Sequence, residues 1–176
     1  AGGRRVSACA AIGCLGTAQQ ATGVQSTPTK LPALTDVVQL LPGNYITPSC
    51  ARKADGTVLC WSPSIVPTPI PDVSDATDIA VAFKHVFIRS KSRGFLFSAP
   101  SQDGLSWLPA APYDVPGNPA AMSAGNSFCT LGDDGVVSCS SLDDPPQAPP
   151  SPVPVPGPPP GDVAEIAVGS GFLYGR

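Results

Sequence analysis

The chain has 176 residues, 42% of them hydrophobic, and no apolar run approaches the ~20 residues that a membrane-spanning helix needs. Its formal net charge is −3, and its ten Lys and Arg are scattered, so they form no basic stripe that could bind a phosphate backbone. We therefore expect neither membrane insertion nor a nucleic-acid partner.

The composition favours turns and strands over helices. There are 18 Gly and 23 Pro, and the acidic residues are all Asp except Glu165. Surface helices are usually built from Glu, Lys, Ala and Leu, whereas Asp, Gly and Pro gather in turns. The sequence therefore predicts an all-β fold with many turns.

The predicted elements begin with a short hairpin that carries Cys9 and Cys14. A Pro-containing approach and an apolar strand follow in "PALTDVVQLLPG", and then a longer hairpin in "CARKADGTVLCW", which starts at Cys50 and turns at Asp55-Gly56. Asp-Gly between apolar strands is a strong hairpin signal, because a type I′ turn needs positive φ at both central positions.

The next hairpin is predicted in "IRSKSRGFLFS", where Gly94 holds the turn and Ile88 and Ser98 stand in place of cysteines. The segment "CTLGDDGVVSCS", which starts at Cys129, repeats the earlier pattern and turns at Asp134-Gly135. A proline-rich stretch, "DDPPQAPPSPVPVPGPPPGD", should then be extended polyproline II without strand pairing. A last strand is expected from residue 162 onward.

Five marker positions recur about every 40 residues, which indicates internal repeats: Cys9, Cys50, Ile88, Cys129 and Leu173. Cysteines that flank a hairpin turn face each other, so we predict the disulfides Cys50–Cys60 and Cys129–Cys139, with Cys9–Cys14 as a third. Each would stabilise the fold by roughly 2–3 kcal/mol and would suit an oxidising compartment. The alternative is that the cysteines are free thiols in a reducing compartment.

The pattern from Leu34 to Trp61, with its apolar strand, glycine and Cys-flanked Asp-Gly turn, resembles the repeats of the regulator of chromosome condensation family. It is most similar to the secreted branch, in which paired cysteines flank that turn. The resemblance implies β-propeller blades, of which the family usually has seven. The sequence departs from the family pattern after Trp61, where Ser62 replaces a glycine, and the usual Gly-Gln-Leu-Gly turn is missing.

The repeats allow about four blades, so we expect a partial or split propeller. Residues 1–142 would hold the propeller repeats, 143–161 a proline-rich insert, and 162–176 a strand of a further or closing blade. Three explanations of the blade number stay open: a fragment of a longer ectodomain, a small or open propeller closed by its last strand, or a unit completed by other chains.

The proline-rich insert also resembles tracts of hydroxyproline-rich wall and surface glycoproteins. That resemblance implies hydroxylation and O-linked glycans, and the candidate positions are Pro149, Pro150, Ser151, Pro152, Pro158, Pro159 and Pro160. A stiff linker and a ligand for a proline-binding domain are the alternatives.

Few residues suggest catalysis. The lone histidine, His85, lies among Phe83, Val86 and Phe87, where a packed side chain is favoured over a base or ligand. The pair Asp133-Asp134 lacks the six or more oxygens of a calcium loop and is interpreted as a solvated turn. We expect no cofactor and no metal.

Three functions remain. The first is an extracellular structural or adhesive module that acts through protein–protein contacts, including self-assembly. The second is an inhibitor or receptor propeller that grips one protein through exposed aromatic residues: Tyr45, Trp61, Trp107 and Tyr113. The third is a sialidase-like hydrolase, suggested only by "SQDGLSW", which is one residue short of the Asp-box of those propellers. We expect secretion and no enzyme activity.

Overall fold

A computed structural model describes residues 34–43, 47–62, 65–101, 105–117, 119–142, 152–156, 163, 165–168 and 173–175. Every regular element in these residues is a β-strand, so the predicted all-β class is confirmed. Within the same residues there is no helix long and apolar enough to cross a membrane.

The strands form three four-stranded sheets of consecutive antiparallel strands, followed by a two-stranded hairpin. They are β1 (Val37–Leu41), β2 (Ser49–Lys53), β3 (Val58–Ser62), β4 (Ile65–Pro69), β5 (Ala76–Ala82), β6 (His85–Ser90), β7 (Gly94–Ser98), β8 (Ala111–Pro112), β9 (Pro119–Ala124), β10 (Ser127–Gly132), β11 (Val137–Ser141), β12 (Val153–Pro154), β13 (Ile166–Val168) and β14 (Leu173–Gly175).

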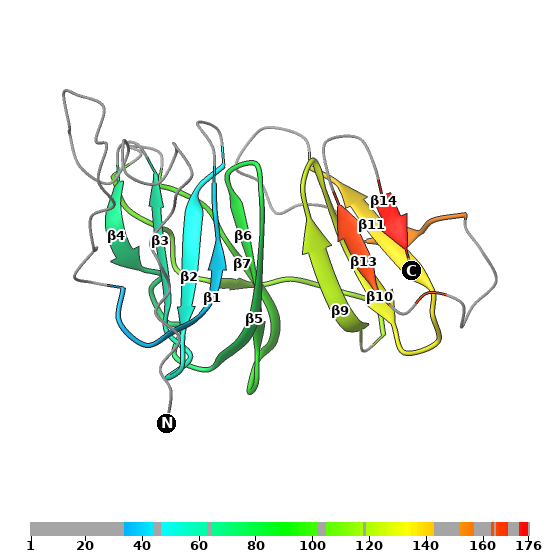
Figure 1. The fold of residues 1–176 in the computed structure, drawn as a ribbon, viewed down its shortest axis with the longest axis horizontal. Coiled ribbons are helices and arrows are strands. Elements are labelled where there is room, and N and C mark those ends of the chain that lie inside the picture. The colour runs from blue at the N-terminus through cyan, green and yellow to red at the C-terminus, as the bar shows by residue number, and fades with distance from the viewer. Residues whose placement is uncertain are drawn as a thin grey trace.

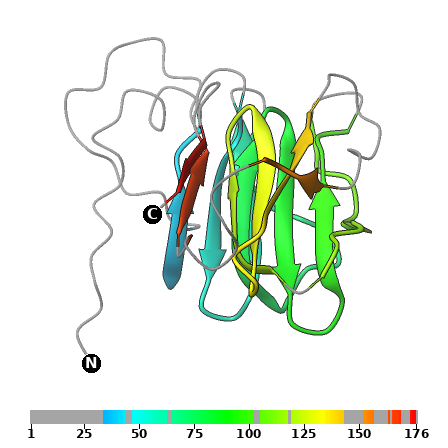
Figure 2. The same cartoon turned by 90° about the vertical axis from the view of Figure 1, so that its right-hand side faces the viewer.

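The sheets follow one another across the molecule, with the first strand of each beside the first strand of the next (Figure 1). Thus β1 contacts β5, β5 contacts β9, and β9 contacts β13. In the view at right angles (Figure 2), the long strands of the successive sheets stand upright side by side. This is the arrangement of a partial β-propeller, and we name β1–β4 blade 1, β5–β8 blade 2 and β9–β12 blade 3.

The central hairpins of blades 1 and 3 turn at the predicted places, but the predicted turn type is wrong. Gly56 and Gly135 have positive φ, 86° and 79°, whereas neither preceding Asp does. Gly56 N–H donates to the Lys53 carbonyl at 3.0 Å, and Gly135 N–H does the same to Gly132. Each turn is therefore a type I turn followed by a glycine bulge, which needs only one residue in the left-handed region.

Disulfides join the two long strands of blades 1 and 3. Cys50 and Cys60 lie directly opposite each other on β2 and β3, ten residues apart in sequence. Cys129 and Cys139 are placed identically on β10 and β11. Both pairs face the following blade: Cys50 and Cys60 pack among blade 2 residues, and Cys129 packs against Ile166 of β13. The predicted pair Cys9–Cys14 lies outside the described residues.

The predicted register of blade 2 is wrong by one residue. Ile88 lies opposite Leu96, not Ser98, and both Ile88 and Leu96 face blade 1. Phe87 and Phe97 lie opposite each other and face blade 3, as the disulfides face their following blades.

The difference arises in the turn. In blade 2 Ser90 lies opposite Gly94, so the glycine is one position later relative to the strands than in blades 1 and 3. When strand positions are counted from the turn glycine, each residue of blade 2 is therefore assigned to the wrong face of the sheet, because side chains alternate between the two faces along a strand.

Aromatic rings form the contact between blades 2 and 3. The rings of Phe87 and Phe128 are stacked, with centroids 4.0 Å apart. Tyr113 meets Phe128 edge-on at 5.5 Å, and Phe97 meets Tyr113 edge-on at 6.1 Å. Such contacts add to simple area burial, and the cluster takes the place that a disulfide occupies in the other two blades.

Polar links also connect successive sheets. The Gln39 side chain accepts a hydrogen bond from Ile79 N–H at 3.3 Å and donates one to the Ile79 carbonyl at 3.0 Å. Arg89 donates to the carbonyls of Pro119 and Ala120. The Ser123 hydroxyl accepts from Val168 N–H at 3.0 Å. These bonds satisfy backbone groups on strand edges that pair with no other strand.

Part of the proline-rich insert is a strand, so the expectation of an unpaired stretch from 143 to 161 is wrong there. Val153 and Pro154 form β12, the outer strand of blade 3, and Val155 N–H donates to the Val137 carbonyl at 2.9 Å. The valines supply N–H groups that the prolines lack. Pro152 is fully buried and could carry no glycan in the folded chain. The other proposed modification positions lie outside the described residues.

The register of blade 2 can be tested by replacing Phe87 and Phe97 with cysteine together. Because the two positions match those of the disulfides in blades 1 and 3, we expect a third disulfide, detected by protection from alkylation until a reductant is added. The double variant Ile88→Cys/Ser98→Cys should not form a direct bond, since these residues are not opposite each other. Pairing in the second variant instead of the first would contradict the register.

Candidate functional site

The aromatic residues predicted to be exposed are buried instead. Trp61, Trp107 and Tyr113 are 1%, 3% and 6% exposed, so the prediction that they grip a partner is wrong. Trp107 donates its indole N–H to the Cys60 carbonyl at 3.1 Å, and Tyr113 donates its hydroxyl to Ser140 at 3.1 Å. Burial raises the pKa of Tyr113. Trp107 and Tyr113 thus lie between blades, whereas Trp61 packs with Ala51 on the side of blade 1 away from blade 2. Tyr45 lies outside the described residues.

His85 is packed as expected. It is 5% exposed, at the start of β6, and its ring lies 6.3 Å from that of Phe87 and 6.5 Å from that of Phe97. In the described part of the chain, no group of three or more His, Cys, Asp or Glu side chains is placed to hold a metal ion. Asp134 accepts a hydrogen bond from Val136 N–H at 3.0 Å, which is the turn role expected of it.

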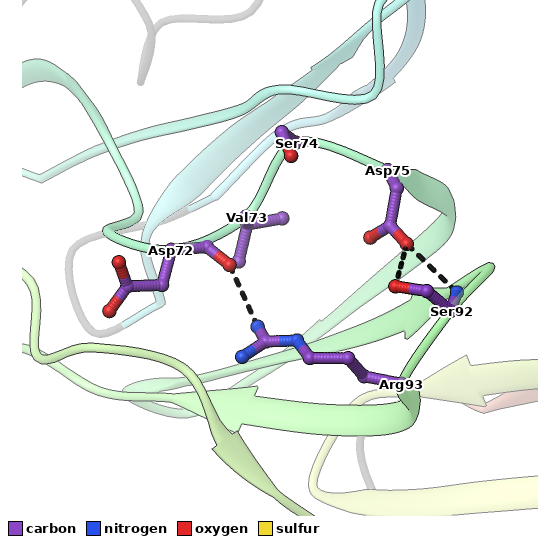
Figure 3. Close-up of a pocket in the computed structure, with 6 residues that line it drawn as sticks. All are labelled: Asp72, Val73, Ser74, Asp75, Ser92 and Arg93. Atoms are coloured by element: carbon purple, nitrogen blue, oxygen red, sulfur yellow. Dashed lines mark hydrogen bonds between the residues drawn. The ribbon is translucent and has the colours of Figure 1, made fainter.

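A polar pocket lies where the linker between blades 1 and 2 meets the β6–β7 turn (Figure 3). Its volume is about 570 Å³. We call it the junction pocket, and it is lined by Asp72, Val73, Ser74, Asp75, Ser92 and Arg93. Most of these side chains are exposed, while Val73 is buried beneath them.

Asp75 holds the two sides of the junction pocket together. Its carboxylate accepts hydrogen bonds from the Ser90 hydroxyl at 2.7 Å, the Ser92 N–H at 2.8 Å and the Ser92 hydroxyl at 2.5 Å. Its carbonyl accepts from Lys91 N–H at 3.1 Å. The Ser92 and Ser90 hydroxyls and the Ser92 N–H lower the pKa of Asp75 from 3.8 to about 2.

The blade 1 turn packs against the same linker. The Gly56 carbonyl accepts from Ala76 N–H at 3.1 Å. A Cβ atom at Gly56 would lie 2.6 Å from the Ser74 carbonyl oxygen, so only glycine fits there. The linker is thus clamped between the turns of two blades, and the pocket has a fixed floor.

The rim of the junction pocket carries both signs of charge. Arg93 donates from Nη2 to the Asp72 carbonyl at 2.8 Å, which directs its guanidinium across the pocket (Figure 3). Asp72 has φ of 61°, a left-handed conformation that Asp tolerates better than most residues, and its carboxylate points away from Ser92. An exposed cation and an exposed anion therefore flank one opening.

A second hollow lies along the first strands. It has a volume of about 230 Å³, and we call it the axial groove. Its lining is mainly apolar: Gln39, Leu41, Pro42, Thr47, Ile79, Ala80, Val81, Met122, Ser123 and Ala124. Three blades contribute to it, so it depends on their packing.

The residues of the junction pocket were missed by sequence reasoning. Asp75 directly precedes the strand β5 and was not singled out from the sequence. Ser92 and Arg93 lie in the hairpin that was placed out of register. A usable signal was the basic and hydroxyl-rich run from Arg89 to Arg93, which contacts the acidic linker from Asp72 to Asp75.

Comparison with solved structures places this fold. The chain is similar to yeast RCC1 (Prp20) in its complex with Kap60, with 20% sequence identity and a TM-score of 0.62, over 84% of this chain and 43% of that one. The fold is that of an RCC1-like β-propeller.

A second similar structure is that of Prp20p from Saccharomyces cerevisiae, described together with its binding properties to Gsp1p and histones. Here the identity is 20% and the TM-score 0.65, over 91% of this chain and 48% of that one. The chain therefore spans less than half the length of these RCC1 chains. No family model and no curated protein sequence matches it.

The Asp75 contact makes stability depend on pH in a defined window. Because the folded-state pKa is lowered, the carboxylate stabilises the fold above about pH 4 and loses this effect as the pH falls through about 2. We expect Asp75→Asn to melt at a lower temperature than the unsubstituted chain at pH 7 and pH 5, with the gap closing between pH 4 and pH 2. Circular dichroism melts measure this.

The matched control is Asp72→Asn, whose carboxylate points away from Ser92 (Figure 3). This variant should show no such pH-dependent gap. A gap for Asp75→Asn that stayed constant from pH 7 to pH 2 would contradict the role given to Asp75.

Proposed function

We propose that the chain is part of a protein-binding β-propeller and that the junction pocket contacts the partner. The observation that carries this proposal is the opposed pair Arg93 and Asp72, both exposed, above a linker fixed by Asp75 and by the Gly56 turn. A rigid loop that presents charges at a fixed spacing on a scaffold is well suited to recognition.

The charges specify the chemistry of the partner surface. Arg93 has five N–H donors in a planar fork and can bind a carboxylate in a bidentate manner. Asp72 would accept from a lysine or arginine. A polar protein surface with an acidic and a basic side chain fits this pattern. The net charge of −3 also favours approach of a basic partner over long range.

The structural neighbours support protein partners as a class. Yeast RCC1 was solved bound to Kap60, and Prp20p is described with its binding to Gsp1p and histones. Kap60, Gsp1p and histones are therefore the first proteins to test for binding to this chain, which spans less than half of either structure.

A second candidate is the extracellular structural module. The two disulfides favour an oxidising compartment, because such bonds rarely persist in the cytosol. In this proposal the chain is secreted, self-association adds to its protein contacts, and the proline-rich segment carries O-linked glycans. The two candidates share protein binding and differ in location.

Charge reversal at the junction pocket tests the proposal. The chain, immobilised, is compared with Arg93→Glu for capture of proteins from an extract of its source cells, followed by quantitative mass spectrometry. We expect Arg93→Glu to capture these proteins in amounts lower by on the order of tenfold, because the loss of one charge-assisted contact of about 1.4 kcal/mol weakens binding by that factor.

The control variant is Val153→Asp, which adds a charge at an exposed position on β12, away from the junction pocket. It should capture the same proteins as the unsubstituted chain. Equal capture by Arg93→Glu, or loss with Val153→Asp alone, would overturn the assignment of the pocket.

A further inference from the structure

The axial groove contains an open length of β-strand edge. Its lining includes Ile79 and Val81 of β5, the strand that contacts both β1 and β9. Because β5 is the first strand of blade 2, it pairs only with β6, and its other edge lies beside the groove. The backbone N–H and C=O groups on this edge are therefore open to atoms in the groove and not to another strand.

Gln39 shows which chemistry this edge accepts. Its side chain accepts a hydrogen bond from Ile79 N–H at 3.3 Å and donates one to the Ile79 carbonyl at 3.0 Å, so one carboxamide reaches both backbone groups of one residue. Asp78 accepts from Gln39 Nε2 at 2.7 Å and shares the Ile79 N–H at 2.9 Å, while Arg52 Nε donates to Gln39 Oε1 at 3.1 Å. These bonds fix Gln39 as a wall of the groove.

Val81 presents the same pair of backbone groups without such a partner. The N–H and C=O of Ile79 point away from β6, and this direction alternates along an antiparallel strand, so those of Val81, two residues later, point to the same side. No side chain of the described residues hydrogen-bonds to Val81. Since Gln39 is held at Ile79, the Val81 groups are left for a ligand in the groove.

The rest of the groove favours an uncharged ligand with an apolar group. Leu41, Pro42 and Met122 contribute apolar surface, and no charged side chain lines the groove. The Ser123 hydroxyl accepts from Val168 N–H at 3.0 Å, which leaves its own hydrogen to donate. A volume of about 230 Å³ suits a small organic molecule and not a folded partner.

We propose that the axial groove binds a small uncharged molecule that carries a primary carboxamide on an apolar group. The carboxamide pairs with Val81 as Gln39 pairs with Ile79: its oxygen accepts from the Val81 N–H, and its own N–H donates to the Val81 carbonyl. A carboxylate has no N–H to donate, and its charge would leave water without a cation in the groove to offset the loss.

NMR spectroscopy of the full chain labelled with ¹⁵N tests this with benzamide as the ligand. We expect the backbone N–H resonance of Val81 to shift and to saturate with a Kd of about 1 mM, the affinity expected of so small a molecule. N,N-dimethylbenzamide keeps the ring and the carbonyl but has no N–H, and benzoate is charged. Both should bind at least about tenfold more weakly, because each leaves the Val81 carbonyl without its donor.

Val81→Pro removes the N–H that the ligand needs. Because this N–H does not pair with β6, proline at the strand edge leaves the ladder hydrogen bonds in place, which circular dichroism checks. We expect benzamide binding, followed on the Ser123 resonance, to weaken by on the order of tenfold. The control variant Val153→Asp on β12 should bind benzamide as the unsubstituted chain does.

Equal affinity for benzamide and N,N-dimethylbenzamide, or no change at Val81 up to about 10 mM benzamide, would refute the inference even if Val81→Pro fails to fold. The inference goes beyond the proposed function and does not depend on the junction pocket. Arg93→Glu should bind benzamide unchanged, and benzamide should leave protein capture through Arg93 unaffected. Failure of one proposal is therefore distinguishable from failure of the other.

Discussion

The packing of each blade's central hairpin against the next blade is the constraint on which the rest of the structure depends. The same two positions face the following blade in each of blades 1, 2 and 3: Cys50 and Cys60, Phe87 and Phe97, and Cys129 and Cys139. A sheet buried on both sides needs apolar residues along both faces, and this explains the continuous apolar run in β6. The axial groove and the junction pocket exist only because these contacts fix the spacing of the blades.

Two different kinds of side-chain pair make this contact between blades. In blades 1 and 3 a disulfide ties the two long strands and presents sulfur to the neighbour. In blade 2 two phenylalanines fill the position: Phe87 stacks on Phe128, and Phe97 meets Tyr113 edge-on. A disulfide acts mainly by limiting the unfolded chain, whereas stacked rings act in the folded state. A chain with few aromatic residues thus uses its rings in the middle blade, which has a blade on each side.

Sequence reasoning could predict the features that are local. Hairpins, their turns and the pairing of Cys50 with Cys60 follow from residues close in the chain. The spacing indicated repeats, and the resemblance to the regulator of chromosome condensation repeats implied the propeller fold. It could not predict which strand face meets the next blade. In blade 2 the turn glycine, Gly94, lies one residue later than in blades 1 and 3, and this shift reverses the face predicted for every residue of the hairpin. The burial of Trp107 and Tyr113 was also missed, because it depends on contacts between residues far apart in the sequence. Each donates a hydrogen bond to a residue of another blade.

The central contact can be measured with a double-mutant cycle between Phe87 and Phe128. Phe87→Leu, Phe128→Leu and the double variant would be unfolded in urea and compared with the unsubstituted chain. Stacking across the blade boundary predicts a coupling free energy of about 0.5–1.5 kcal/mol, and Phe87→Leu paired with Val58→Ala, which belongs to another cluster, should be additive. Additivity of Phe87 and Phe128 within about 0.3 kcal/mol would contradict the proposed packing of the blades.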